Sequence, residues 1–172
     1  MNPYENIDWD SWEPQEKGVV VYISDKKNKK LLLMNKKTGL GKGKVNAPGG
    51  RLEKGESFRD AVIRECQEEV FITPINPEKR AELYFQFTSG YALYGEAFFT
   101  DSWEGEAKES SEADPFWCDM DKIPWDSMWE DDRHWLTSAL NGKKIRGYFV
   151  FDDDDRMLSK NITEVDSFET PY

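Results

Sequence analysis

Apolar residues recur along the chain in short runs that alternate with polar positions or continue unbroken, a pattern typical of β-strands. Polar turns, glycines and an aspartate run separate these stretches. Two segments have helical spacing instead: residues 58–70, which follow the capping residue Ser57, and residues 131–140, which end before Asn141 and Gly142. The expected strands are residues 19–24, 30–36, 82–88, 91–100, 116–119, 148–151 and 158–165.

This order of elements predicts an α+β protein in which helices pack on a sheet. Residues 82–88 and 91–100 are expected to pair as a hairpin, whereas the glycine-rich residues 40–50 and the acidic residues 103–115 are expected to be loops. A chain of 172 residues is long enough to bury the core of one domain.

The first predicted helix changes character along one face. At about 100° per residue, its first turns carry an apolar stripe of Phe58, Ala61 and Val62. The same face continues with three carboxylates, Glu65, Glu68 and Glu69. A surface helix normally keeps its acids opposite the apolar stripe, and acids at a helix C-terminus oppose the helix dipole. These glutamates are therefore expected to point into a cleft at the edge of the core.

A divalent cation would resolve this conflict, because Mg²⁺ and Mn²⁺ prefer carboxylate and water oxygens. On the spacing alone, an exposed helix in which Arg64 pairs with Glu68 explains the pattern better. The metal hypothesis therefore depends on the flanking sequence.

Charge and composition restrict the partners. The net charge of −11 argues against a nucleic-acid polymer, although residues 26–54 hold ten Lys or Arg and one acid, Glu53, and could attract a small anion. There are two cysteines, Cys66 and Cys118, and no apolar run approaches the roughly 20 residues of a membrane span. We expect a cytoplasmic monomer with no membrane association.

The flanking sequence favours the metal hypothesis. Gly50 is followed after five residues by Glu56, after seven more by the pair Arg64-Glu65, and then by Glu68-Glu69. This spacing resembles the Nudix box, G-x5-E-x7-R-E-U-x-E-E-x-G-U, in which U is a bulky apolar residue. Two positions depart from it: Cys66 replaces a larger apolar residue, and Phe71 replaces a glycine. Because Phe adopts a left-handed conformation reluctantly, the helix end is expected to be built differently, which affects the placing of Glu69.

The resemblance implies a Nudix-type α/β/α sandwich with a mixed central sheet and two main helices. Nudix hydrolases cleave a diphosphate linked to another group, usually with Mg²⁺. By position, the metal ligands would be Glu65, Glu68 and Glu69, while Glu56 supports the site and Arg64 orients a carboxylate. The phosphates would lie near Gly49, Gly50, Lys36 and Arg51. Glu69 and Glu112 are both candidates for the general base. Glu112 is also a candidate metal ligand.

The downstream sequence resembles one branch of this family, the MutT-homologue diphosphatases of oxidised purine nucleoside triphosphates. The matching segments are residues 123–124, 128–132, 135, 147–149 and 162–166. We therefore assign residues 19–172 to one Nudix domain and residues 1–18 to an N-terminal extension of unknown role. The resemblance implies that Asn46, Trp129, Asp131 and Asp132 hold the purine, and that Phe85 and Phe87 line its pocket.

Physical chemistry allows the paired aspartates to bind a base, although the residues alone, without the resemblance, favour a simpler role for them. Two adjacent carboxylates in an aromatic pocket disfavour double ionisation, so one can keep its proton and donate while the other accepts. The alternative is that Asp131 or Asp132 only caps the second helix, with Trp129 and Trp135 in the core.

The expected reaction converts an 8-oxo-dGTP-like nucleotide to the monophosphate and pyrophosphate, as in nucleotide-pool sanitisation. Two alternatives remain open. One is a Nudix pyrophosphatase acting on ADP-ribose or a nucleotide sugar, and the other is a non-catalytic nucleotide sensor.

Overall fold

A mixed sheet organises the chain in the computed structural model, which describes residues 4–169. In this part of the chain the sheet has nine strands, with the order β11-β10-β6-β7-β1-β2-β3, and with β4 paired to β1 and β9 to β2. The pairs β1–β7 and β6–β10 are parallel, and the other pairs are antiparallel. The main strands are β1 (Glu16–Asp25), β2 (Lys30–Lys36), β6 (Glu78–Phe87), β7 (Ala92–Thr100), β9 (Ala113–Asp119), β10 (Lys144–Phe151) and β11 (Met157–Val165).

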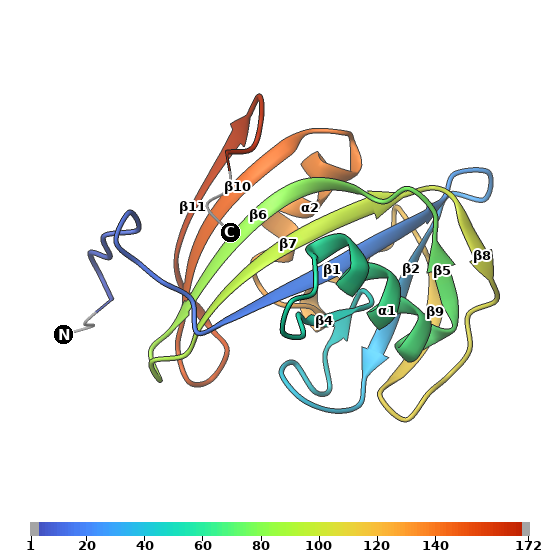
Figure 1. Cartoon of the computed structure of the whole chain (residues 1–172), viewed down its shortest axis with the longest axis horizontal. Helices are drawn as coiled ribbons and strands as arrows, with labels where there is room; N and C mark the ends of the chain where they lie inside the picture. Colours follow the sequence, from blue (N-terminus) through green and yellow to red (C-terminus); the bar gives the residue numbers. More distant parts are fainter. Residues whose placement is uncertain (1–3, 170–172) are drawn as a thin grey trace.

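The shorter elements are two strands of the main sheet, the helices, and two strands that form a small second sheet. They are β3 (Val45–Asn46), β4 (Gly49–Arg51), α1 (Phe58–Val70), β5 (Ile72–Pro74), β8 (Trp103–Gly105), the 3-10 helix η1 (Trp125–Ser127) and α2 (Asp132–Leu140). Strands β5 and β8 pair only with each other. The helices α1 and α2 lie on opposite faces of the main sheet (Figure 1).

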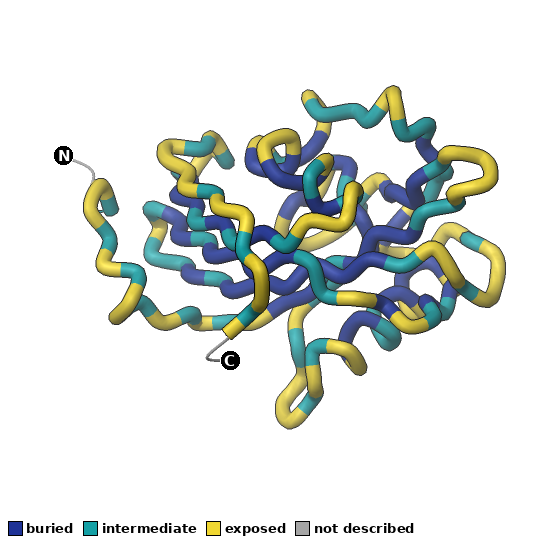
Figure 2. The backbone as a smooth tube through the Cα atoms, turned by 90° about the horizontal axis from the view of Figure 1, so that it is seen from above, coloured by how far each residue is buried: buried dark blue, intermediate teal, exposed yellow. Residues whose placement is uncertain are grey.

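The core is divided between these two faces. Val21 and Ile23 of β1 belong to the cluster beneath α1, whereas Tyr22 belongs to the cluster that contains Trp135 of α2. This alternation follows from the period of two along a strand. The central strands are buried and the connecting loops are largely exposed (Figure 2). The predicted α/β/α sandwich is confirmed.

The two predicted helices form nearly as expected. Helix α1 spans Phe58–Val70, and the Ser57 hydroxyl accepts a hydrogen bond from the Asp60 amide at 3.1 Å, as an N-cap does. Helix α2 begins one residue later than predicted, at Asp132, and ends with Asn141 as its C-cap.

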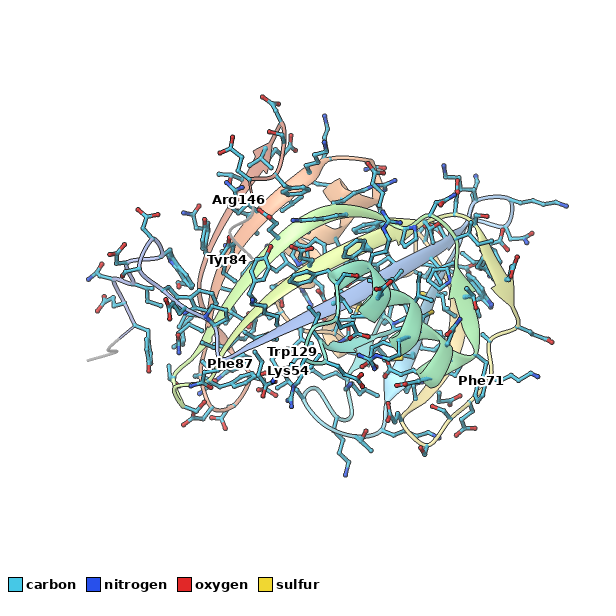
Figure 3. All side chains as sticks on the ribbon, viewed as in Figure 1. Lys54, Phe71, Tyr84, Phe87, Trp129 and Arg146 are labelled. Carbon is cyan, nitrogen blue, oxygen red and sulfur yellow. The ribbon has the colours of Figure 1, made fainter. Side chains whose placement is uncertain are left out.

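The end of α1 corrects one expectation. Phe71 occupies the C-cap in a left-handed conformation, with φ 64° and ψ 27°, and its amide donates to the Gln67 carbonyl at 3.1 Å. The helix therefore ends with the cap that glycine would form, despite the steric cost of a side chain there. Its ring is 52% exposed, and it lies far from the pocket residue Trp129 (Figure 3).

Several strand boundaries also differ from the prediction. The expected loop at residues 103–115 is wrong at both ends, because β8 begins at Trp103 and β9 begins at Ala113. Pro115 obscured β9, but it is tolerated because β9 pairs only with β2 and its other edge needs no amide donor. Strand β1 begins at Glu16, three residues before the expected domain start.

Two further observations concern the chain as a whole. Within residues 4–169, no helix combines the length and apolar character needed to cross a bilayer. Cys66 and Cys118 are buried free thiols.

Candidate functional site

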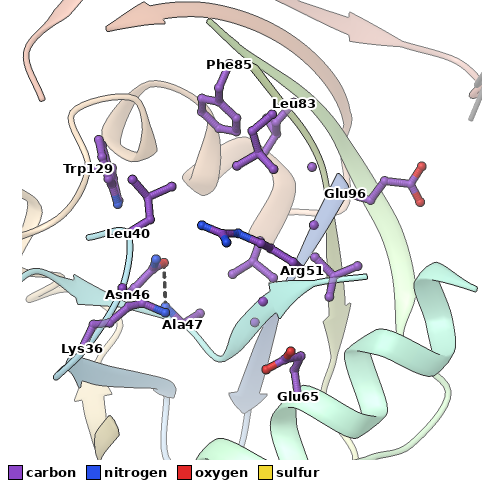
Figure 4. A pocket seen from close by; sticks show the side chains of 18 of the residues that line it. Lys36, Leu40, Asn46, Ala47, Arg51, Glu65, Leu83, Phe85, Glu96 and Trp129 are labelled. Atoms are coloured by element: carbon purple, nitrogen blue, oxygen red, sulfur yellow. Dashed lines mark hydrogen bonds between the residues drawn. The ribbon is translucent and has the colours of Figure 1, made fainter. Parts of the chain in front are cut away.

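A cavity of about 460 Å³ opens between the glycine-rich segment, β1, the β6–β7 hairpin and the start of α2. Figure 4 shows Trp129 and Phe85 towards one end and Glu65 of α1 towards the other, with Arg51 between them. The residues singled out from sequence that line it are Lys36, Asn46, Gly49, Gly50, Arg51, Arg64, Glu65, Glu69, Phe85, Phe87, Glu112, Trp129, Asp131, Asp132 and Trp135. Glu56 and Glu68 lie near this wall but are not part of it.

Arg64 organises the acidic end of the site. Its guanidinium donates to both oxygens of Glu56, at 2.7 and 2.8 Å, and to Glu65 at 2.9 Å. A longer bond of 3.3 Å reaches Glu68, whose side chain is 54% exposed. The hydrogen bonds from Arg64 lower the pKa of Glu56 to about 2. One cation thus holds three carboxylates on the same side of α1.

Glu69 is the most buried acid of the motif. It is 1% exposed, and its Oε1 accepts a hydrogen bond from the Gly49 amide at 2.8 Å. Burial raises the pKa of Glu69 to about 7, against the lowering effects of the Gly49 amide and the charge of Lys36. Glu69 can therefore exchange a proton near neutral pH.

The adjacent glycines are required by close approaches. A Cβ at Gly49 would lie 2.1 Å from the Val19 carbonyl oxygen, and one at Gly50 would lie 2.4 Å from the carboxyl carbon of Glu65. Only glycine therefore lets β4 pair with β1 directly above the Glu65 carboxylate. Burial raises the pKa of Glu65, while the neighbouring Arg64 opposes this shift.

The other end of the cavity holds two adjacent buried aspartates. Asp131 accepts a hydrogen bond from the Trp135 indole at 2.9 Å, and burial raises the pKa of Asp131 to about 6. Oδ2 of Asp132 is buried and has no hydrogen-bond partner among residues 4–169. Burial, reinforced by the charge of Asp131, raises the pKa of Asp132 well above its ordinary value. The pair thus favours a state that holds at least one proton.

The capping alternative is partly correct. Asp131 occupies the N-cap position of α2, but its side chain makes no capping hydrogen bond there. Trp135 is a core residue at 1% exposure, as that alternative expected, and both Trp129 and Trp135 line the cavity. The Asp131 carboxylate is therefore used to hold Trp135 rather than the helix terminus.

Aromatic rings form the wall beside these acids. Trp129 meets Phe87 and Phe151 edge to face, with ring centroids 5.9 and 5.3 Å apart. The Asn46 side-chain oxygen accepts from the Ala47 amide at 2.9 Å (Figure 4), which leaves its NH₂ group as a donor for a ligand. This end of the cavity can stack on a flat heterocycle and bond to its edge.

The cavity is also lined by residues that the sequence reasoning did not single out, among them Leu40, Leu83 and Tyr91. Leu83 could have been found, because it shares the period of two with the predicted Phe85 and Phe87. Tyr91 and Leu40 depend on the folding of a turn and a loop, for which the sequence carries no comparable signal.

Comparison with known proteins identifies the family. The NUDIX domain profile matches residues 14–139. The chain is 36% identical over 140 residues to the oxidized purine nucleoside triphosphate hydrolase of Mus musculus, covering 81% of this chain and 90% of that protein. It is 38% identical over 138 residues to the Danio rerio protein of the same name, covering 80% and 88%.

A solved structure agrees with the sequence matches. The MutT protein from Bacillus halodurans superposes with a TM-score of 0.74 at 27% identity, covering 86% of this chain and 97% of that one. The fold is that of MutT-type hydrolases. The chain belongs to the Nudix family and is a Nudix hydrolase.

Nudix hydrolases generally use divalent metal ions. Such an ion needs oxygen donors, and the acidic end of the site is where this chain offers them. Its donors are carboxylate oxygens, which suit a hard cation, and the space above Gly50 is kept open for the Glu65 carboxylate. Within residues 4–169, however, no three His, Cys, Asp or Glu side chains are already arranged around a common point. The carboxylates fit such an ion chemically, and Glu65 and the half-exposed Glu68 both pair with Arg64 in this structure.

Proposed function

We propose that this enzyme hydrolyses oxidised purine nucleoside triphosphates, such as 8-oxo-dGTP, to the monophosphate and pyrophosphate. The observation that carries the proposal is the buried Oδ2 of Asp132, which has no hydrogen-bond partner among residues 4–169 and lies beside Asp131 in the aromatic end of the cavity. A buried polar atom without a partner is costly, and a ligand that bonds to it removes that cost. The names of the mouse and zebrafish relatives agree with this substrate class.

The paired aspartates suit the edge of an oxidised purine. A protonated Asp132 donates through its hydroxyl to a ring nitrogen or carbonyl, while Asp131 accepts from a ring NH. The Asn46 NH₂ group supplies a second donor, and Trp129 supplies a stacking face. Oxidation adds a carbonyl and an NH to the purine, so its edge gains the groups that such a pocket can bond.

At the acidic end, Glu65, Glu68 and Glu69 would hold Mg²⁺ or Mn²⁺, with Glu112 as a further ligand. When bound, the ion neutralises phosphate charge and lowers the pKa of an attacking water. Arg64 and Glu56 position the carboxylates through their hydrogen bonds. Lys36 and Arg51 offset the remaining phosphate charge, and Gly49 and Gly50 allow the phosphates to approach the backbone.

Hydrolysis adds water across the α–β phosphoanhydride bond. The water oxygen bonds to phosphorus, the bridging P–O bond breaks, and one water proton passes to the general base. Glu69 and Glu112, which both line the cavity, are the two candidates for that role. We further propose that the enzyme acts as a cytoplasmic monomer on small nucleotides alone.

A nucleotide panel with Mg²⁺, scored by chromatography of the nucleoside monophosphate that every substrate in it would release, tests the proposal. The panel contains 8-oxo-dGTP, dGTP, ATP, ADP-ribose and a nucleotide sugar, and the oxidised purine triphosphate is expected to have the highest kcat/KM. Turnover of ADP-ribose or the nucleotide sugar at an equal or higher kcat/KM would overturn the substrate class. Glu69→Gln is expected to lower kcat by about 100-fold or more, whereas the exposed Glu104→Gln retains full activity.

A further inference from the structure

The N-terminal segment covers the face of the hairpin that points away from the cavity. Along β6, Phe85 and Phe87 face the cavity, so the intervening Gln86 and the preceding Tyr84 face the other side. Trp12 packs against Tyr84 with ring centroids 5.6 Å apart, and Trp9 packs against Tyr148 of β10 at 5.0 Å. Figure 3 shows Tyr84 and Arg146 on this part of the sheet.

Trp12 also makes one directed contact with the hairpin. Its indole NH donates to the side-chain oxygen of Gln86 at 2.8 Å. The Gln86 NH₂ group in turn donates to the carbonyl of Phe87 at 2.9 Å and to that of Tyr91 at 3.2 Å. Because the indole can only donate, it fixes which end of the Gln86 amide faces those two carbonyls.

Two neighbouring residues of the segment reach the same turn. The Gln15 amide donates to the Ala92 carbonyl at 2.9 Å. The Glu16 carboxylate accepts from the Tyr91 hydroxyl at 3.0 Å and pairs with Arg51 at 2.5 Å. Residues 12–16 therefore contact the β6–β7 turn at both of its ends.

These contacts converge on the cavity wall. Phe87, Tyr91 and Arg51 all line the cavity, and Phe87 and Tyr91 pack together with ring centroids 5.7 Å apart. Phe87 also contacts Trp129, the expected stacking surface. Gln86 is 5% exposed, so its amide has little water available to replace the Trp12 bond.

We propose that residues 12–16 are a positioning segment, and that Trp12, acting through Gln86, sets the Phe87–Tyr91 wall of the base pocket. Trp12 and Gln86 touch no substrate; they hold the turn in the geometry that accepts a heterocycle. The identity of that heterocycle rests on the proposed function, whereas the positioning role applies to whichever nucleotide the enzyme hydrolyses fastest.

Steady-state kinetics on that nucleotide test the positioning role. Trp12→Phe keeps the ring but removes the NH donor, and should raise KM about fivefold, the effect of one neutral hydrogen bond, with kcat nearly unchanged. Trp9→Phe is the matched control, because its described contacts are ring contacts alone, and it should leave KM unchanged. Inhibition by inorganic tripolyphosphate, which lacks a base, should be equal in all three proteins.

A double variant separates positioning from general loosening. If Trp12 acts through Gln86, Trp12→Phe combined with Gln86→Met should have the KM of Gln86→Met alone. An unchanged KM in Trp12→Phe, or an equal rise in the tripolyphosphate inhibition constant, would overturn the inference. Failure of the proposed function would appear separately, as a preference of the unmutated enzyme for a nucleotide other than an oxidised purine.

Discussion

Asp132 and Glu69 are both buried acids with raised pKa values, but their surroundings give them different capacities. The Gly49 amide fixes one Glu69 oxygen as an acceptor. Asp132 has an oxygen that no described group satisfies, so a ligand can use it. The sequence predicted that both positions matter, through the motif and through the adjacent aspartates. It could not predict their protonation, because burial in the folded chain sets the pKa values.

Replacing Asp132 by Asn should change how stability depends on pH in the ligand-free protein. The pKa of Asp132 is higher in the folded than in the unfolded chain, so the folded state binds the proton more tightly. Its contribution to stability is present below the unfolded pKa and is lost as pH rises through the folded pKa. Urea unfolding between about pH 5 and about pH 8 should show a smaller decline in Asp132→Asn than in the unmutated protein.

Asp126→Asn is the control for this experiment, because that side chain is 98% exposed. It should follow the unmutated protein across the pH range. A decline in Asp132→Asn as steep as that of the unmutated chain would contradict the raised pKa.

Helix α1 shows which elements can be predicted from local sequence. Its start is set by Ser57 and its apolar stripe is set by spacing, so its predicted bounds agree with the structure. Strands β5, β8 and the first half of β9 were missed, because they form by pairing with distant segments and contain Pro74, Pro115 or acidic residues. The cap at Phe71 was also missed, since propensity disfavours a left-handed Phe, although the chain adopts that conformation where α1 ends and β5 begins.

Phe71 provides a test at the scale of this element. Phe71→Gly and Phe71→Ala both remove the half-exposed ring, but only Gly adopts φ 64° without a clash between Cβ and the backbone. The Gly variant should therefore be more stable than the Ala variant by about 1 kcal/mol. Denaturant unfolding of the two variants measures this difference. Equal stability, or a more stable Ala variant, would mean that the cap is not left-handed in solution.

At the scale of the whole molecule, the cavity lies where the two layers meet. Helix α1 supplies the carboxylates, the start of α2 supplies the aspartates, and β6, the β6–β7 turn and the segment before α2 supply the aromatic wall. The Nudix box allowed the fold and the acidic end to be predicted from sequence. The role of the N-terminal segment could not be predicted from sequence, because Trp12 bonds to Gln86, 74 residues away, and no motif marks the pair.

Metal binding should be visible as a change in the stability of the whole fold. Mg²⁺ that binds only the folded chain stabilises it by about 3 kcal/mol when the ion is at a hundredfold excess over Kd. This stabilisation raises the melting temperature. Differential scanning calorimetry with and without Mg²⁺ should show this shift in the unmutated protein. It should be lost in the double variant Glu68→Gln/Glu69→Gln, while NaCl at matched ionic strength reproduces none of it. An equal Mg²⁺ shift in the double variant would place the ion elsewhere.

The central claim is that one cavity selects an oxidised purine and hydrolyses its triphosphate. A competition assay tests it most directly: equal concentrations of 8-oxo-dGTP, dGTP and ADP-ribose are mixed with enzyme and Mg²⁺, and the products are separated by chromatography. Initial product ratios then equal the ratios of kcat/KM. The account predicts that 8-oxo-dGMP forms fastest in the unmutated enzyme, and that Asp132→Ala reduces this preference by about tenfold, since a hydrogen-bonding group of the base edge left unpaired costs about 1–3 kcal/mol. Faster cleavage of ADP-ribose than of 8-oxo-dGTP, or an unchanged preference in Asp132→Ala, would contradict it.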